Sequence, residues 1–268
     1  MNIEEALNTL DLSKYPVDEI NELISRLYPL GLLSCPISIG STIQRISPYI
    51  NDSVQMLSYN QDPPKYGRAN IPHVPMFYGC LDIPNDNKTT NEMIVAILEG
   101  RALNNGVSIF STWRVEKTLR VGCIIHPSIF PGSNNKFLIR LKLRYSLLVK
   151  KYRNSQIDKV WKQVCAQFSK RNPTKKDYNY LFTALLTRRL LEEGPYDGIL
   201  YPSVQTEGNV CMNIALTKDA VDNKISFEKA QKSLIYKEDV DTYRSTPLQI
   251  GVSNDGKSIV WSESTINH

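Results

Sequence analysis

Residues 195–217 read PYDGILYPSVQTEGNVCMNIALT, and this stretch decides the fold. It follows Glu193-Gly194, where a helical pattern stops. Two apolar runs, 198–203 and 210–217, flank the turn Glu207-Gly208-Asn209 and have the texture of two consecutive strands. The stretch therefore predicts a pair of strands placed directly after a long helical block.

Working outward, the chain divides into segregated helical and strand-like regions. Helical periodicity covers residues 3–30, about 89–99 and 136–193, and strand-like runs cover 37–47, 76–79, 107–113 and 119–125, with weaker signals at 232–237, 248–252 and 258–261. Helices and strands that are grouped in this way favour an α+β fold with a mixed or antiparallel sheet. No GxGxxG or GxxxxGK[ST] motif is present to suggest a dinucleotide fold or an ATP-binding loop.

The composition excludes several classes of protein. The 268 residues are 41% hydrophobic and 22% charged, which is the balance of a folded chain and not of a disordered one. No apolar run is long enough to span a bilayer, and the acidic N-terminal stretch lacks the apolar core of a signal peptide. The five cysteines form no CxxC pair, so we expect reduced thiols, no metal site and a cytoplasmic protein without membrane contact.

Positive charge is concentrated in one part of the chain. Residues 136–189 hold fifteen Lys or Arg and two acids, a net +13, so the rest carries −8 to give the total of +5. Such a block suits an anionic partner or an acidic surface of the same molecule. Trp161 and several tyrosines recur at helical spacing within it, which is more typical of core packing, and no nucleic-acid reader motif is present. Binding of nucleic acid is therefore the less favoured interpretation.

Five polar residues are candidates for a catalytic or binding site, although each could equally have a purely structural role. Arg45 lies inside a predicted strand and either faces water or meets an anion; Arg68 follows a glycine in a loop. Glu92 fits a capping box with the threonine three residues earlier. Tyr78 ends a short strand and could be an aromatic residue of the core. Ser203 follows a strand and could be an ordinary turn residue.

Together these residues resemble the RES domain, a family named for its Arg, Glu and Ser. The segments that carry the resemblance are Gly67-Arg68-Ala69-Asn70 with Val74–Gly79, then Thr90-Asn91-Glu92, then Tyr196–Ser203 with Gly208-Asn209, and Arg45 in the strand before them. The resemblance covers about residues 37–220. It implies a fold related to the mono-ADP-ribosyltransferases and an activity on NAD. Members are toxins of two-gene systems, so a neutralising antitoxin partner is implied as well.

The resemblance assigns a role to each candidate, and the chemistry is reasonable. Cleavage of the nicotinamide–ribose bond gives the ribose oxocarbenium character, which a carboxylate at Glu92 would stabilise. Arg45 and Arg68 would pair with the pyrophosphate, and Tyr78 would stack on the cationic nicotinamide. Ser203 would contact the substrate or orient Glu92, with supporting places for Asn70 and Asn209. NAD is then the substrate and no metal is needed.

Three functions stay open at this point. The first is hydrolysis or phosphorolysis of NAD, and the second is transfer of ADP-ribose to a protein. The third is a non-enzymatic nucleic-acid-binding protein on a degenerate RES-like scaffold. We expect three regions: a helical extension (1–36), a catalytic domain (37–220) and a C-terminal tail packed on it (221–268). A contact between copies of the chain, giving a homo-oligomer, is also possible.

Overall fold

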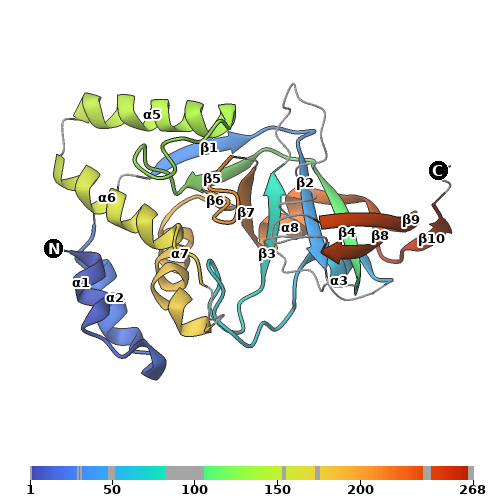
Figure 1. The fold of residues 1–268 in the computed structure, drawn as a ribbon, viewed down its shortest axis with the longest axis horizontal. Coiled ribbons are helices and arrows are strands. Elements are labelled where there is room, and N and C mark those ends of the chain that lie inside the picture. The colour runs from blue at the N-terminus through green and yellow to red at the C-terminus, as the bar shows by residue number, and fades with distance from the viewer. Residues whose placement is uncertain are drawn as a thin grey trace.

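A single mixed sheet organises the chain in the computed structural model (Figure 1). The structure describes residues 2–28, 30, 32–47, 52–81, 106–152, 155–172, 176–209, 211–237 and 243–264. The strands are β1 (Leu33–Ile37), β2 (Thr42–Ser47), β3 (Met76–Leu81), β4 (Gly106–Val115), β5 (Leu119–Cys123), β6 (Gly198–Pro202), β7 (Met212–Thr217), β8 (Ile225–Lys237), β9 (Tyr243–Val252) and β10 (Val260–Glu263). Their order across the sheet is β1-β5-β6-β7-β3-β2-β4-β8-β9-β10.

The sheet is mixed because one neighbouring pair, β5 and β6, runs parallel, whereas the other pairs described run antiparallel. This agrees with the expectation of a mixed sheet. The expected strand over residues 37–47 is divided, because Gly40 adopts a φ of +84° and turns the chain between β1 and β2. The weak strand signals near the C-terminus correspond to β8, β9 and β10.

The helices gather around the end of the sheet that β1, β5 and β6 form (Figure 1). They are α1 (Ile3–Asn8), α2 (Val17–Ser25), α5 (Lys136–Tyr152), α6 (Ser155–Phe168) and α7 (Leu181–Glu193), with short helices α3 (Val54–Ser58) and α8 (Lys218–Lys224) elsewhere and single 3₁₀ turns at Leu12–Lys14 and Asp177–Tyr180. The apolar stripes predicted in the basic block face the core. Their centres are at most 2% exposed: Leu138, Leu141, Tyr145, Trp161, Val164, Phe168, Leu181 and Ala184.

The α5–α6 helical pair is joined to the sheet by polar contacts as well as by apolar packing. His126 follows β5 and is buried, and its Nε2 lies 3.3 Å from Asp158 Oδ1 on α6. Tyr145 of α5 donates its hydroxyl to the same Asp158 oxygen at 3.2 Å. The backbone N–H of Ser128 donates to His126 Nδ1 at 3.1 Å, which leaves the ring proton on Nε2, facing the carboxylate. The burial lowers the pKa of His126 below its usual 6.5.

The C-terminal strands lie against the segment around α3. The backbone N–H of Val54 donates to Lys257 O at 2.8 Å, and Trp261 Nε1 donates to Asp52 Oδ1 at 2.7 Å. The ammonium of Lys232 lies 3.9 Å from the centre of the Trp261 ring. Residues after 220 therefore continue the sheet beyond β4 and close over the α3 segment.

Gly198 of β6 lies close against the backbone of β7, and this generates a stability prediction. A Cβ at this position would lie 2.1 Å from Ala215 O and 2.9 Å from Leu216 Cα, both backbone atoms that cannot rotate away. Gly198→Ala should therefore lower the free energy of unfolding by about 2–3 kcal/mol, measured by urea denaturation. Gly132→Ala is the matched control, because nothing lies within 4 Å of its Cβ position, and it should stay within about 0.5 kcal/mol of the native chain.

A second prediction concerns pH. The pKa of His126 is lowered in the folded state, so the unfolded chain binds more protons and stability falls as pH drops below about 6.5. The charged groups facing the ring are Asp158, which opposes this shift, and Lys142 and Lys162, which add to it. His126→Gln should reduce the slope with which the free energy of unfolding falls between pH 7.5 and 5.5. The reduction should be less than about 1.4 kcal/mol per pH unit, the limit for one titrating group. An unchanged slope in this variant, or an equal change in the exposed His73→Gln, would contradict the assignment.

Candidate functional site

Arg45 is partly buried, and its guanidinium is bound within the protein. Its strand, β2, lies between β3 and β4, and its guanidinium reaches from β2 to its neighbours. Nε donates to Leu57 O of α3 at 2.9 Å, and an Nη donates to Tyr78 O of β3 at 2.7 Å. Burial lowers the pKa of Arg45 to about 10, so the group keeps its charge at neutral pH. The strand interior therefore holds a cation whose described hydrogen bonds go to backbone carbonyls.

The Tyr78 hydroxyl is the centre of the loop that carries the Gly-Arg-Ala-Asn motif. It accepts the backbone N–H of Ala69 at 2.9 Å and donates to Asn70 Oδ1 at 2.8 Å. The Asn70 amide donates in turn to Lys65 O and Ile71 O, both at 3.1 Å. Burial raises the pKa of Tyr78 well above its usual range, so the phenol stays protonated. Asn70 thus connects the loop backbone to the Tyr78 hydroxyl through its side-chain hydrogen bonds.

Gly67 is required by this same network. A Cβ there would lie 2.2 Å from Asn70 Oδ1 and 2.8 Å from Tyr78 Oη. Because these two atoms are already hydrogen-bonded to one another, neither can move without breaking the network. The glycine of the motif is therefore explained by close packing of polar atoms.

Arg68 joins this loop to the end of α6. One Nη donates to Phe168 O and the other to Lys170 O, the latter at 3.1 Å. Its guanidinium lies 5.2 Å from the centre of the Tyr180 ring. Arg68 is partly exposed and holds the motif against the basic helical block, in addition to placing a positive charge beside Tyr78.

Ser203 lies at the end of β6 and is completely buried. Its Oγ accepts the N–H of Thr206 at 3.4 Å, and its carbonyl accepts the N–H of Gly208 at 2.8 Å. Asn209, in the same turn, is exposed and accepts the N–H of Asn134 at 3.1 Å. Both residues thus shape the β6–β7 turn, and Asn209 also ties this turn to the loop before α5.

The strand register brings two of the family-like segments together. Cys80 of β3 is opposite Asn213 of β7, which is opposite Tyr201 of β6. Opposite residues share a face, and so do residues two apart, so Tyr78 lies on this face too. The family-like segments that include β3 and β6 are therefore separated by only one strand, β7.

Asn213 is a candidate that sequence reasoning missed. It is 5% exposed, in the middle of the sheet, and its Oδ1 lies 3.5 Å from Cys80 Sγ. The signal in the sequence is a single amide within the apolar run Met212–Thr217. A buried amide beside Tyr78's strand adds hydrogen-bonding capacity to the face that carries the motif residues.

Glu92 lies outside the described residues, in the segment 82–105. That segment joins β3 to β4, the strands on either side of β2, so both of its attachment points lie beside the strand of Arg45. Within the described part of the chain, no group of three or more His, Cys, Asp or Glu could hold a metal ion. Also within it, no helix is long and apolar enough to cross a membrane.

The Tyr78 network generates a third prediction. Tyr78→Phe removes one hydroxyl and leaves the Ala69 N–H and Asn70 Oδ1 without this partner. We expect a loss of about 1–3 kcal/mol of unfolding free energy in urea titrations. Tyr236→Phe, at a site 38% exposed, removes the same hydroxyl from the surface and should cost under about 0.5 kcal/mol. Equal losses in the two variants would show that the network does not stabilise the loop.

Comparison with known proteins agrees with the resemblance in the sequence. The family model of the RES domain matches residues 126–236, from His126 through α5–α8, β6 and β7 into β8. The match includes the Tyr196–Ser203 segment and Asn209, whereas Arg45, Arg68, Asn70, Tyr78 and Glu92 precede it. No curated protein matches the chain. The family model and the late motif agree on this region, so the similarity to the RES domain is confirmed over residues 126–236.

Proposed function

We propose that the protein is an enzyme that consumes NAD, cleaving its nicotinamide–ribose bond by hydrolysis or phosphorolysis. The observation that carries the proposal is the RES-domain match over residues 126–236. The strand order supports it, because β3, with Tyr78, lies one strand away from β6 of the matched region. A sheet related to that of the mono-ADP-ribosyltransferases is part of the same proposal.

Glu92 is the residue that we propose acts on the reacting carbon. As nicotinamide leaves as a neutral base, the ribose develops oxocarbenium character, and a fixed carboxylate stabilises that charge. The bond that breaks joins the ribose C1′ to the pyridinium nitrogen, which takes the bonding electrons. Water or phosphate then forms the new bond to C1′ and releases its proton.

Arg45 and Arg68 supply the positive charge that an anionic dinucleotide requires. Arg45 is held rigidly by carbonyls of α3 and β3, so it contributes a fixed cation next to Tyr78. Arg68 is partly exposed and can direct its remaining N–H groups toward a pyrophosphate. The ring of Tyr78 is the proposed stacking surface for nicotinamide, since its hydroxyl is fixed by Ala69 and Asn70.

Ser203, Asn70 and Asn209 are proposed as positioning residues. The complete burial of Ser203 favours a role in orienting its surroundings, Glu92 among them, over direct contact with NAD. Asn70 orients Tyr78, and Asn209 fixes the β6–β7 turn. By analogy with the family, we propose that the protein acts in the cytoplasm as the toxin of a pair, held inactive by an antitoxin protein.

Loss of NAD tests this proposal. Purified protein is incubated with NAD with and without phosphate, and nicotinamide, ADP-ribose and its phosphate are separated. The native chain should release nicotinamide, and Glu92→Gln should lower the turnover number by about 10²- to 10³-fold while the thermal transition stays in place. The phosphate dependence identifies the acceptor.

The matched control is Glu19→Gln, the same chemical change on the exposed side of α2, which should turn over NAD like the native chain. NAD labelled in the adenine distinguishes free ADP-ribose from ADP-ribose attached to a protein. Full activity in Glu92→Gln would remove Glu92 from the site. Absence of turnover by folded protein, with and without phosphate and an added protein acceptor, would overturn the proposed activity.

A further inference from the structure

The helix α5 has apolar stripes on two sides. Leu138, Leu141 and Tyr145 are at most 2% exposed and pack into the core. A second stripe of three aliphatic residues points to solvent: Ile139, Leu143 and Leu147, which are 40%, 60% and 68% exposed. At 3.6 residues per turn, the centres of the two stripes lie about 165° apart around the helix axis. The outer stripe is therefore not an extension of the core.

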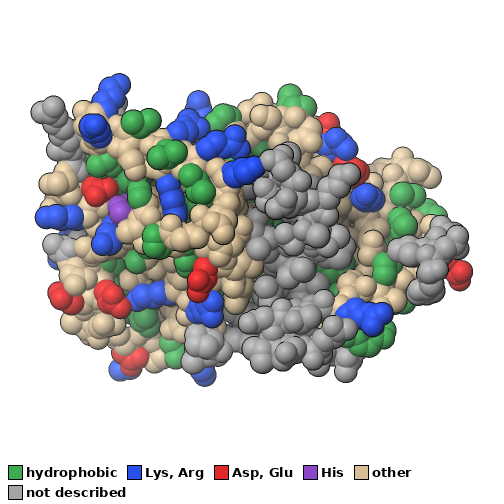
Figure 2. All heavy atoms as spheres, turned by 45° about the horizontal axis from the view of Figure 1, so that its top comes forward, with side chains coloured by type: hydrophobic (Ala, Val, Ile, Leu, Met, Phe, Trp, Pro, Cys, Tyr) green, Lys and Arg blue, Asp and Glu red, His purple; other side chains and the backbone are tan. Residues whose placement is uncertain are grey.

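The outer stripe is continuous along the helix. Its members are four residues apart, which aligns them as one ridge over about 12 Å. Figure 2 shows hydrophobic and basic side chains side by side over this part of the surface. Single exposed leucines are common, but three in register on one helix form a surface to which another helix can fit, ridge into groove.

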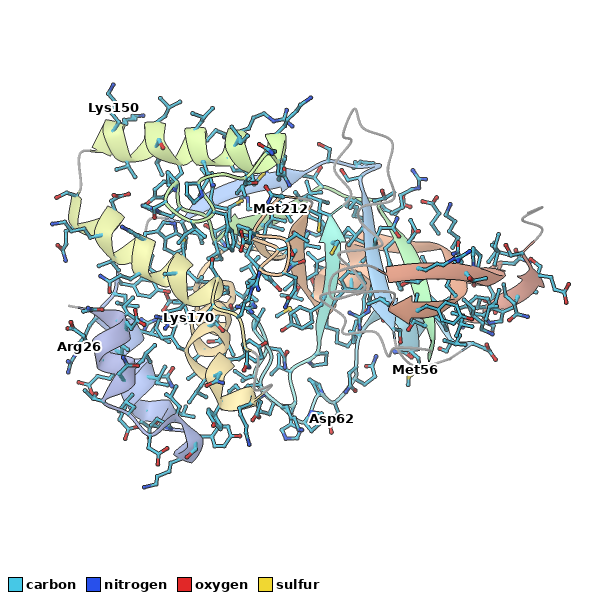
Figure 3. The ribbon with its side chains drawn as sticks, viewed as in Figure 1. Arg26, Met56, Asp62, Lys150, Lys170 and Met212 are labelled. Carbon is cyan, nitrogen blue, oxygen red and sulfur yellow. The ribbon has the colours of Figure 1, made fainter. Side chains whose placement is uncertain are left out.

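Cations border the ridge along one flank and at its two ends. The exposed basic residues of α5 are Lys136, Arg140, Arg144, Lys150 and Lys151, and the helix contains no acidic residue. Figure 3 places Lys150 on the side of α5 that faces away from the rest of the molecule. An apolar ridge bordered by one sign of charge selects a partner with an apolar stripe bordered by the opposite sign.

We propose that this outer face of α5 binds an acidic amphipathic helix of a partner protein. The face is defined by Ile139, Leu143 and Leu147 with the basic residues around them. The inference does not depend on NAD turnover, because none of these residues belongs to the candidate site. It assigns to the chain an interaction surface for a protein of stated chemistry.

Charge argues against the other occupants of this face. A two-fold contact between copies would bring five cations against five cations, which is unfavourable. Phosphate groups of a nucleic acid would pair with the cations but would leave the aliphatic ridge without a partner. A lipid surface is the third alternative, but over residues 136–151 of α5, where the structure describes the side chains, no aromatic residue of the kind that anchors interfacial helices is exposed. An acidic amphipathic partner helix matches both the apolar ridge and the sign of the charge beside it.

The test uses a labelled helical peptide of about 18 residues, with leucines on one face and glutamates beside them. Its matched control carries lysine in place of each glutamate. The native chain should bind the acidic peptide in fluorescence anisotropy with micromolar affinity, and added salt should weaken the binding. The lysine peptide should bind at least about tenfold more weakly.

The double variant Leu143→Glu/Leu147→Glu should lose at least about tenfold in affinity for the acidic peptide. Both sites are exposed, so the fold should survive, which circular dichroism and the thermal transition check. The control is Leu248→Glu/Ile250→Glu, two aliphatic residues of β9 that are about as exposed as Ile139, and it should bind like the native chain.

Four outcomes would overturn the proposal. The first is absence of peptide binding up to about 100 µM, and the second is equal binding by the double variant. The third is that the acidic peptide does not bind, whereas vesicles containing phosphatidylserine, or a DNA duplex, bind the native chain but not the double variant. The fourth is a native dimer in sedimentation that the double variant dissociates, which would make the face a contact between copies.

Discussion

Pairing of β3 with β7 is the constraint on which the rest of the structure depends. All six residues of β3 are in register with β7, from Met76 opposite Thr217 to Leu81 opposite Met212. This ladder joins strands that precede residue 82 to strands that follow residue 197. It is close-fitting, since the neighbouring β6 approaches β7 so tightly that only glycine fits at position 198. The Arg45 cation then fixes β2 against β3 by donating across the strands.

The sequence predicted the elements better than their arrangement, for a physical reason. Helical and strand periodicities are local, so the core stripes around Trp161 and the two strands after residue 197 could be predicted from spacing alone. The position of β5 between β1 and β6 depends on pairing across more than seventy residues, which no local pattern encodes. The break at Gly40 was missed because a positive φ leaves no mark beyond the glycine itself.

In the candidate site too, the sequence identifies the type of residue but not the group that the residue contacts. Arginine in a strand indicates a charge that needs a partner, but the sequence could not tell an anion from the carbonyls that Arg45 and Arg68 in fact contact. Ser203 was singled out by its motif, and its burial became visible only when the β6–β7 turn closed around it. Asn213 needed the register with Cys80 to be noticed at all.

The cations that give residues 136–189 their net charge of +13 have different surroundings once the chain is folded. Four cations from the end of α6 onward are close to acids of the same molecule: Lys170 to Glu4, Arg171 to Glu207, Arg188 to Glu192 and Arg189 to Glu193. These pairs are exposed and add little stability, so their effect is to balance charge locally. The cations of α5 share their helix with no acid. The folded chain thus places acids beside four cations at the end of the block, whereas the cations of α5 share their helix with exposed aliphatic side chains.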